Sequence, residues 1–193
     1  MQARLAATDL ACRRGDRLLF RGLSLAFGPG EALHVTGANG VGKSSLIRIL
    51  AGLLRPFAGS VSREGRVGLV DERLALDESV PLGPALDFWR RLDGHGDAAA
   101  HREQLALTDL LDVPVRYLST GQRKRAALAR LLASEAPVWL LDEPLNGLDS
   151  EAKSVAETLI ARHCEDGGVC LVASHQPIAL PGGRTLPLAE FAA

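Results

Sequence analysis

The sequence predicts an α/β fold with a mainly parallel sheet, and three observations support this prediction. Short apolar stretches alternate with segments of helical periodicity along most of the chain. Residues 138–141 and 169–173 are wholly apolar, which is typical of strands that are buried on both faces. The length of 193 residues, with 47% apolar and 23% charged residues, suits a single domain with its own hydrophobic core.

The first third of the chain is predicted to be rich in strands. Two strands, at residues 5–10 and 18–27, flank a tight turn, and a third strand covers residues 32–36. A Gly-rich loop comes next, and apolar residues at helical spacing then predict a helix over residues 43–54. A further short strand is expected at residues 67–70.

The remainder is predicted to begin with a short helical insertion at about residues 74–117 and then to alternate helix and strand. The expected helices cover residues 86–92, 98–111, 121–133 and 150–163. Two wholly apolar strands lie between and after the last two of these helices, and residues 186–188 are expected to pair at the edge of the sheet.

Composition excludes several classes of function. The 22 basic and 23 acidic residues give a net charge of −1, so no bulk positive field attracts nucleic acid. The longest apolar stretches are far shorter than the roughly 20 residues of a membrane-spanning helix, and we expect no secretory leader, because the first residues lack the basic-then-apolar pattern. We therefore expect a protein that stays in the cytosol. The three cysteines have no Cys-x-x-Cys spacing, so reduced thiols are expected.

A phosphate-binding loop follows the third predicted strand and opens the first predicted helix. It fits the pattern G-x-x-x-x-G-K-[ST] in the strand–loop–helix context that the pattern requires. Its residues are Gly37, Ala38, Asn39, Gly40, Val41, Gly42, Lys43 and Ser44, followed by Ser45. Glycines let backbone N–H groups turn toward phosphate oxygens, and the helix N-terminus adds partial positive charge. Lys43 is expected to reach the β- and γ-phosphates, and Ser44 to ligate Mg²⁺.

Two carboxylates, Asp142 and Glu143, end the apolar strand at residues 138–141. We expect this strand to lie beside the phosphate-loop strand, with Asp142 at the edge where ligands bind and able to hold Mg²⁺. Glu143 is expected on the opposite side of the strand, where it serves as a base for the attacking water or orients it. An ordinary solvated strand end is the alternative interpretation of the pair.

A second anion site is predicted at the start of the helix at residues 121–133. Ser119, Gly121 and Gln122 precede the basic triplet Arg123-Lys124-Arg125, and a Ser hydroxyl with backbone N–H groups binds anions at a helix start. This site is distinct from the phosphate loop, which suggests a nucleotide held between two copies of the chain. Alternatively, Ser119 acts only as a helix cap.

In this order, the motifs resemble the ATP-binding-cassette family over nearly the whole chain. Asp149 matches the loop that follows the acidic strand in that family, and His175 matches its switch histidine. The resemblance implies a P-loop NTPase cassette fold over residues 1–193, with an antiparallel N-terminal β part and a helical subdomain. It also implies ATP and Mg²⁺ as ligands and a head-to-tail homodimer. Ser119 and Gly121 then contact the γ-phosphate across the dimer, Glu143 is the catalytic carboxylate, and His175 contacts the γ-phosphate.

Three positions depart from the family pattern. The family's glutamine loop falls at Asp71-Glu72-Arg73, which contains no Gln, so Glu72 is the candidate for that place and for a metal ligand. The aromatic residue that usually stacks on adenine is missing, and Arg14 is expected to stack on the base instead. Thr120 replaces the second glycine of the signature.

Within the family, the chain resembles the haem exporter ATP-binding subunits of the cytochrome c maturation system. Residues 10–20, 37–48 and 174–177 carry this resemblance, together with the compact insertion. It implies peripheral attachment at the cytoplasmic face of the inner membrane, on permease subunits of that system. Direct haem binding is not expected, because no Cys-x-x-Cys-His or paired His motif is present. The ATPase of another small exporter and a soluble non-transport cassette module are the alternative functions.

Overall fold

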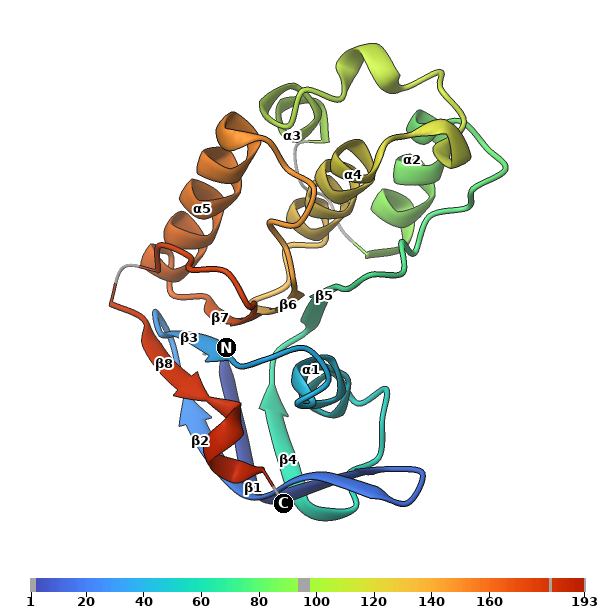
Figure 1. Cartoon of the computed structure of the whole chain (residues 1–193). Coiled ribbons are helices and arrows are strands. Elements are labelled where there is room, and N and C mark those ends of the chain that lie inside the picture. The colour runs from blue at the N-terminus through green and yellow to red at the C-terminus, as the bar shows by residue number, and fades with distance from the viewer. Residues whose placement is uncertain (1–2, 94–97, 181, 193) are drawn as a thin grey trace.

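Two β-sheets form the framework of the computed structural model, which describes residues 3–93, 98–180 and 182–192 (Figure 1). The first sheet is antiparallel, in the order β2-β1-β4, and contains β1 (Arg4–Arg14), β2 (Arg17–Phe27) and β4 (Ala58–Glu64). The second sheet is parallel throughout, in the order β5-β6-β7-β3-β8. Its strands are β3 (Ala32–Thr36), β5 (Val67–Val70), β6 (Val138–Asp142), β7 (Val169–Ala173) and β8 (Arg184–Pro187).

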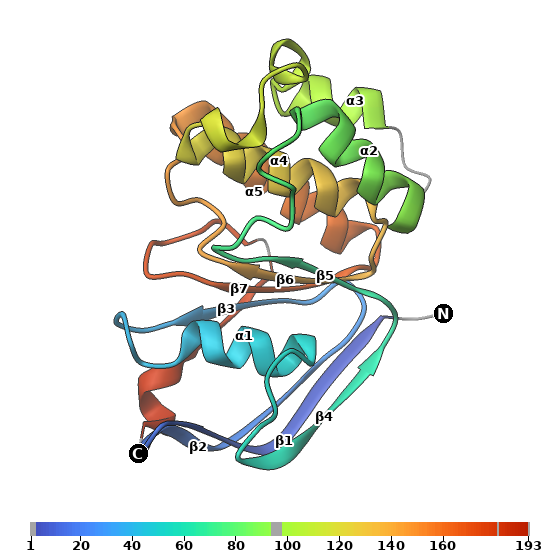
Figure 2. The ribbon, with the colours of Figure 1, turned by 90° about the vertical axis from the view of Figure 1, so that its right-hand side faces the viewer.

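Helices cover both faces of the parallel sheet (Figure 2). Helix α1 (Lys43–Ala51) lies between the two sheets, whereas α4 (Thr120–Ala133) and α5 (Ser150–Glu165) cover the opposite face. Helices α2 (Leu82–Asp93) and α3 (Ala98–Gln104) lie beyond α4. Short 3₁₀ turns occur at Thr108–Leu110, Val115–Tyr117 and Leu188–Phe191. The predicted fold class, α/β with a mainly parallel sheet and an antiparallel N-terminal part, is confirmed.

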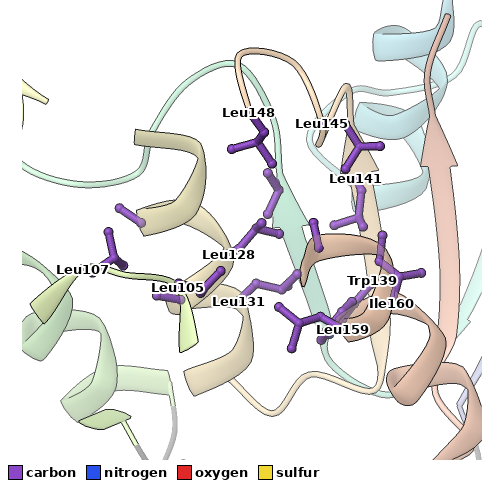
Figure 3. Close-up of a cluster of buried hydrophobic side chains, with 14 of the residues drawn as sticks. Leu105, Leu107, Leu128, Leu131, Trp139, Leu141, Leu145, Leu148, Leu159 and Ile160 are labelled. Atoms are coloured by element: carbon purple, nitrogen blue, oxygen red, sulfur yellow. The ribbon is translucent and has the colours of Figure 1, made fainter. Parts of the chain in front are cut away.

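The alternation of side chains along β6 divides the interior into two hydrophobic clusters. Val138 and Leu140 pack in the cluster that includes α1 and the antiparallel sheet. Trp139 and Leu141 pack in the other cluster, beside leucines of α4 and α5 (Figure 3). Because successive residues of a strand point to opposite faces, Asp142 continues the first set and faces α1. The hydrophobic pattern thus aims this carboxylate at the start of α1.

The predicted position of the acidic strand is wrong. Strand β6 does not lie beside the phosphate-loop strand β3, because β7 lies between them and pairs with both. Helix α1 nevertheless packs against β6, which brings Ser44 to Asp142 across the sheet. Strand order was not predictable from local sequence, because each of these short apolar strands is equally able to pair with any other.

Two predicted helices are also too long, and one strand was missed. Helix α1 ends at Ala51, since Gly52 adopts a left-handed conformation with φ of 81° and donates to the last carbonyls. Helix α3 ends at Gln104, and Ala106 has a positive φ of 48°. Strand β4 escaped prediction because most of its residues are exposed, so it has no apolar run.

Candidate active site

The phosphate loop connects β3 to α1 and bends through three glycines with positive φ, namely Gly37, Gly40 and Gly42. Glycine is required at position 42 for two reasons. Its φ of 115° is unfavourable for other residues, and a Cβ there would lie 3.1 Å from the ring of Phe20. Lys43 is buried, and its Nζ donates to the carbonyl oxygens of Gly37 at 2.8 Å and Ala38 at 3.4 Å. The lysine therefore curls back over the loop that it ends.

A cavity of about 320 Å³ opens on this loop. It is lined by Leu19, Asn39, Gly40, Gly42, Lys43, Ser44, Ser45, Glu72 and Glu143. The first turn of α1 contains no acidic residue, and no side-chain hydrogen bond caps it within the described part of the chain. The backbone N–H groups at this helix start are thus available to an anion, together with the Lys43 ammonium. Sequence reasoning missed Leu19, since it reads only as one more apolar residue of β2.

Asp142 is only 2% exposed, and the Ser44 hydroxyl is near enough to act on its carboxyl. Its Oδ1 is buried and has no hydrogen-bond partner among the described residues. Burial raises the pKa of this carboxyl, as do the neighbouring carboxylates Glu143 and Glu72, whereas Ser44 and Lys124 oppose the rise. A buried carboxylate oxygen without a partner, beside a serine hydroxyl, suits a hard cation such as Mg²⁺.

Glu143 lies just beyond β6 in a left-handed backbone conformation, with φ of 46°. The expectation that it projects from the far side of the strand is wrong, because β6 ends at Asp142. The Glu143 N–H donates to the carbonyl of Ala173 at 2.8 Å. Its carboxylate accepts from the backbone N–H of His175 at 3.1 Å and lies 3.0 Å from His175 Nδ1 and 3.7 Å from Lys43 Nζ. Three predicted site residues from distant parts of the sequence therefore meet.

The signature segment forms a self-contained helix cap. The Ser119 hydroxyl accepts from Gln122 N–H at 3.2 Å, and the Gln122 side chain accepts from Ser119 N–H at 2.8 Å. Gly121 is needed for close packing, because a Cβ there would lie 2.5 Å from the carbonyl oxygen of Gly147. Both the predicted anion site and its alternative, the helix cap, use the same atoms.

A second cavity, of about 550 Å³, separates the signature from the acidic residues. Its lining consists of Asp71, Glu72, Leu74, Leu118, Ser119, Thr120, Arg123, Lys124, Glu143 and Asn146. Glu72 and Glu143 line this cavity and the phosphate-loop cavity alike. The two carboxylates therefore form a shared wall between the two cavities.

Asp149 and Arg14 are predicted site residues that line neither cavity. Asp149 is exposed and caps α5, where its carboxylate accepts from Ala152 N–H at 2.8 Å. Arg14 is exposed at the end of β1 and is close enough to Cys12 to lower the pKa of its thiol, although burial raises that pKa more strongly. The neighbouring Arg13 holds its guanidinium over the ring of Phe57, 4.6 Å from the centroid.

Comparison with known proteins decides the family. The model of the ABC transporter family matches residues 20–146. A relative from Novosphingobium aromaticivorans, "Cytochrome c biogenesis ATP-binding export protein CcmA", is 63% identical over 187 residues, or 97% of this chain and 96% of the relative. The chain belongs to the ABC transporter family. It is an ABC ATPase domain, which binds and hydrolyses ATP as a subunit that works with membrane permease partners.

Further relatives support the same assignment for this ABC ATPase. A Zymomonas mobilis protein with the same name is 52% identical over 192 residues, or 99% of this chain and 87% of the relative. A metal-chelate type ABC transporter, solved in an inward-facing conformation, has 26% identity and a TM-score of 0.76, and the match covers 92% of this chain and 75% of that one. The resemblance to cassette ATPases and to the cytochrome c maturation subunits is thus confirmed. No helix in the described ranges is long and apolar enough to cross a bilayer.

Proposed function

We propose that this ABC ATPase is the ATP-hydrolysing subunit of the haem exporter of a cytochrome c maturation system. The observation that carries the proposal is the near full-length match to relatives named as ATP-binding export proteins of cytochrome c biogenesis. Such a subunit uses ATP hydrolysis to move its membrane partners. We assign the site residues in turn to ATP binding, metal binding, hydrolysis and dimerisation.

The phosphate loop is assigned to ATP binding. Residues Gly37, Ala38, Asn39, Gly40, Val41, Gly42, Lys43, Ser44 and Ser45 surround the triphosphate with backbone N–H groups and one ammonium. When phosphates enter, Lys43 exchanges the carbonyls of Gly37 and Ala38 for β- and γ-phosphate oxygens. The exposed Arg14, at the end of β1, is proposed to stack on the adenine base.

Ser44, Asp142 and Glu72 are proposed to hold Mg²⁺. The Oδ1 of Asp142 supports this, because it is buried near Ser44 in the first turn of α1 and has no hydrogen-bond partner among the described residues. Within the described ranges, no group of three His, Cys, Asp or Glu side chains is arranged to bind a metal alone. That fits Mg²⁺, which commonly takes most of its ligands from phosphates and water. The ion supplies charge neutralisation for the phosphates and for the developing negative charge.

Glu143 is proposed as the general base for the attacking water, and His175 as its positioning partner and a γ-phosphate contact. Their direct contact supports this pairing, because the His175 N–H and ring hold the carboxylate in one orientation. The left-handed backbone of Glu143, anchored to Ala173, turns the side chain from the strand toward Lys43. A carboxylate 3.7 Å from the phosphate-binding lysine is well placed to take a proton from water.

Two chains are proposed to close head to tail around two ATP molecules. Ser119, Gly121 and Gln122 of one chain face the γ-phosphate that the other chain holds, and Asp149 lies at the same interface. The start of α4 supports this role, since its backbone N–H groups point out of the helix end and its first turn carries no acidic residue. Residues 74–117 are proposed as the helical subdomain, with the permease docking beside it near residues 72–86. The chain then attaches peripherally to the cytoplasmic face of the inner membrane.

The test is to purify tagged Glu143→Gln protein from its native membranes in gentle detergent with ATP present. Blocked hydrolysis is expected to hold the complex closed, so cytochrome c maturation membrane subunits are recovered with it. Recovery of a different permease would keep the ATPase mechanism and overturn the haem pathway. Recovery of only ribosomes or other soluble proteins would overturn the transporter function. Wild-type protein prepared without ATP provides the matched control.

A further inference from the structure

The signature and the loop that follows Glu143 pack against each other within one chain. A Cβ on Gly121 would lie 2.5 Å from the carbonyl oxygen of Gly147. In the other direction, a Cβ on Gly147 would lie 2.9 Å from the Cγ2 methyl of Thr120 and 3.6 Å from the backbone nitrogen of Gly121. The start of α4 therefore contacts the backbone of this loop at two successive residues.

The hydrophobic core holds the inner side of the loop at residues 143–149. Leu145 and Leu148 are only 4% and 7% exposed and pack beside leucines of α4 and α5 (Figure 3). Gly147 lies between them in the sequence, is exposed and has a left-handed φ of 79°. The loop is thus fixed by two leucines on its buried side and meets the Thr120 methyl on its exposed side.

Gly147 is linked to Glu143 by a single turn. The N–H of Asn146, the residue before Gly147, donates to the carbonyl of Glu143 at 3.3 Å. Thr120, Asn146 and Glu143 also line the same cavity. A displacement of the loop at Gly147 is therefore transmitted through one turn to the residue that is proposed as the base.

We propose that Thr120 is a positioning residue, which holds this loop against the signature and thereby sets the position of Glu143. The inference rests on the proposed function and extends it to a residue that departs from the family pattern. The glycine that the family carries at this place has no methyl to make the contact. The Cγ2 methyl makes it here, because the Thr120 hydroxyl is not among the three atoms nearest to a Cβ on Gly147.

The contact has a consequence for the proposed dimer. There, the signature of one chain faces the ATP of its partner, whereas Glu143 acts on the ATP that its own chain holds. The Thr120 methyl therefore joins the two ATP sites through one chain. Engagement of the signature at one site then favours the active position of the base at the other, which makes hydrolysis cooperative in ATP.

The test compares two substitutions at Thr120 in the full-length protein, purified with a tag from its native membranes. Thr120→Ser removes only the methyl, whereas Thr120→Val keeps a methyl and replaces the hydroxyl. ATPase rates over a range of ATP concentrations give kcat, KM and the Hill coefficient. We expect Thr120→Ser to lower kcat on the order of fivefold and to weaken the cooperativity, with KM within about twofold of wild type. Thr120→Val is expected to stay within about twofold of wild type in kcat and KM.

Nucleotide titration and thermal melts separate positioning from a structural role. Both are expected to give wild-type results for Thr120→Ser, because Thr120 is exposed and lies outside the phosphate loop. Thr158→Ser, at an exposed threonine of α5 outside both cavities, is the matched control.

Three results would overturn the proposal while ATP hydrolysis by the wild type upholds the proposed function. They are a defect in Thr120→Val, wild-type kinetics in Thr120→Ser, and a loss of ATP affinity in Thr120→Ser as large as its loss of kcat. A wild type that neither binds nor hydrolyses ATP would instead overturn the proposed function.

Discussion

The N-termini of α1 and α4 both begin with backbone N–H groups that have no partner within the helix, but only the N-terminus of α4 is capped by side chains. At α1, Gly42 supplies a left-handed turn, and no side chain of residues 3–93, 98–180 or 182–192 caps the helix, so its first N–H groups stay open. At α4, Ser119 and Gln122 satisfy each other's backbone N–H groups in a closed capping box. Neither first turn contains an acidic residue, so both keep the partial positive charge of the helix.

The difference indicates when each terminus meets an anion. An uncapped helix start with a lysine folded over it can bind phosphate without any contribution from a second chain. A closed terminus is stable by itself and must exchange its internal hydrogen bonds when a phosphate from another chain arrives. ATP is therefore expected to bind first at the phosphate loop, and the signature is expected to engage later, on dimer closure.

The largest effect is expected from removing the ammonium at the open terminus. Lys43→Ala is predicted to lower kcat/KM for MgATP by on the order of 10³, because both phosphate binding and transition-state stabilisation are lost. Steady-state ATPase assays and nucleotide titration measure the two losses. Lys153→Ala is the control. Retention of nucleotide binding by Lys43→Ala would show that the Lys43 ammonium is not what binds the phosphates at the start of α1.

Glu143→Gln is expected to separate binding from hydrolysis at the same terminus. The amide cannot take a proton from water, so kcat is predicted to fall by about 10²–10³ while nucleotide affinity stays near that of the wild type. Single-turnover hydrolysis of labelled ATP, with binding measured in parallel, tests this. Glu165→Gln, at the end of α5, is the matched carboxylate control. Wild-type turnover in Glu143→Gln would rule out Glu143 as the base.

A pair of glycine variants tests whether loop geometry creates the open terminus. Gly42→Ala forces a Cβ to within 3.1 Å of Phe20 at a φ of 115°, whereas Gly40→Ala meets no atom within 4 Å at a φ of 82°. Both cost about 1–2 kcal/mol of backbone strain, but only Gly42→Ala displaces the loop as well. Titration should show the weaker ATP binding in Gly42→Ala. Equal affinities would mean that contact with Phe20 does not set the loop.

Two substitutions at Ser119 probe the closed terminus. Ser119→Ala removes the cap and is predicted to lower the free energy of unfolding by about 1 kcal/mol. Ser119→Asp keeps a good cap, so its stability should match that of the wild type within about 0.5 kcal/mol. Its carboxylate nevertheless opposes an incoming phosphate, so ATP-dependent dimerisation of the hydrolysis-blocked protein should be lost. Denaturant melts and size-exclusion chromatography measure the two quantities, and a dimer that persists in Ser119→Asp would contradict the assigned role.

The smallest effect is expected at the opposite end of the sheet, away from both helix starts. His163 stacks on Trp139, and burial lowers its pKa, while the carbonyls of Val169 and Pro137 and the charge of Asp166 oppose the shift. The folded state then binds fewer protons than the unfolded state, so this stability is fully present above the ordinary histidine pKa of 6.5. It is lost as the pH falls from there through the lower pKa of the folded state. The melting temperature of His163→Phe should therefore fall less than that of the wild type between pH 7 and 5, by on the order of 2 °C. Parallel pH profiles of the two proteins would mean that folding does not change the pKa of His163.

The sequence by itself determined the local chemistry of this protein. The spacing of Gly42, Lys43 and Ser44 after a strand was sufficient to predict the phosphate loop, because backbone conformation and helix start are local properties. The apolar strands β6 and β7 were equally readable, since burial on both faces leaves a continuous apolar run. The signature was recognised as a helix start, and its cap is the local hydrogen bonding that Ser119 and Gln122 predict.

Only the tertiary structure decided which of these pieces meet. It inserted β7 between β3 and β6, and it still brought Asp142 to Ser44 because α1 crosses to β6. It also turned Lys124 from one charge in a basic triplet into a buried side chain that lines the cavity next to the signature. Strand order and burial depend on the packing of distant segments around one core. No local pattern contains that information, so sequence identified the reactive groups and the fold assembled them into a site.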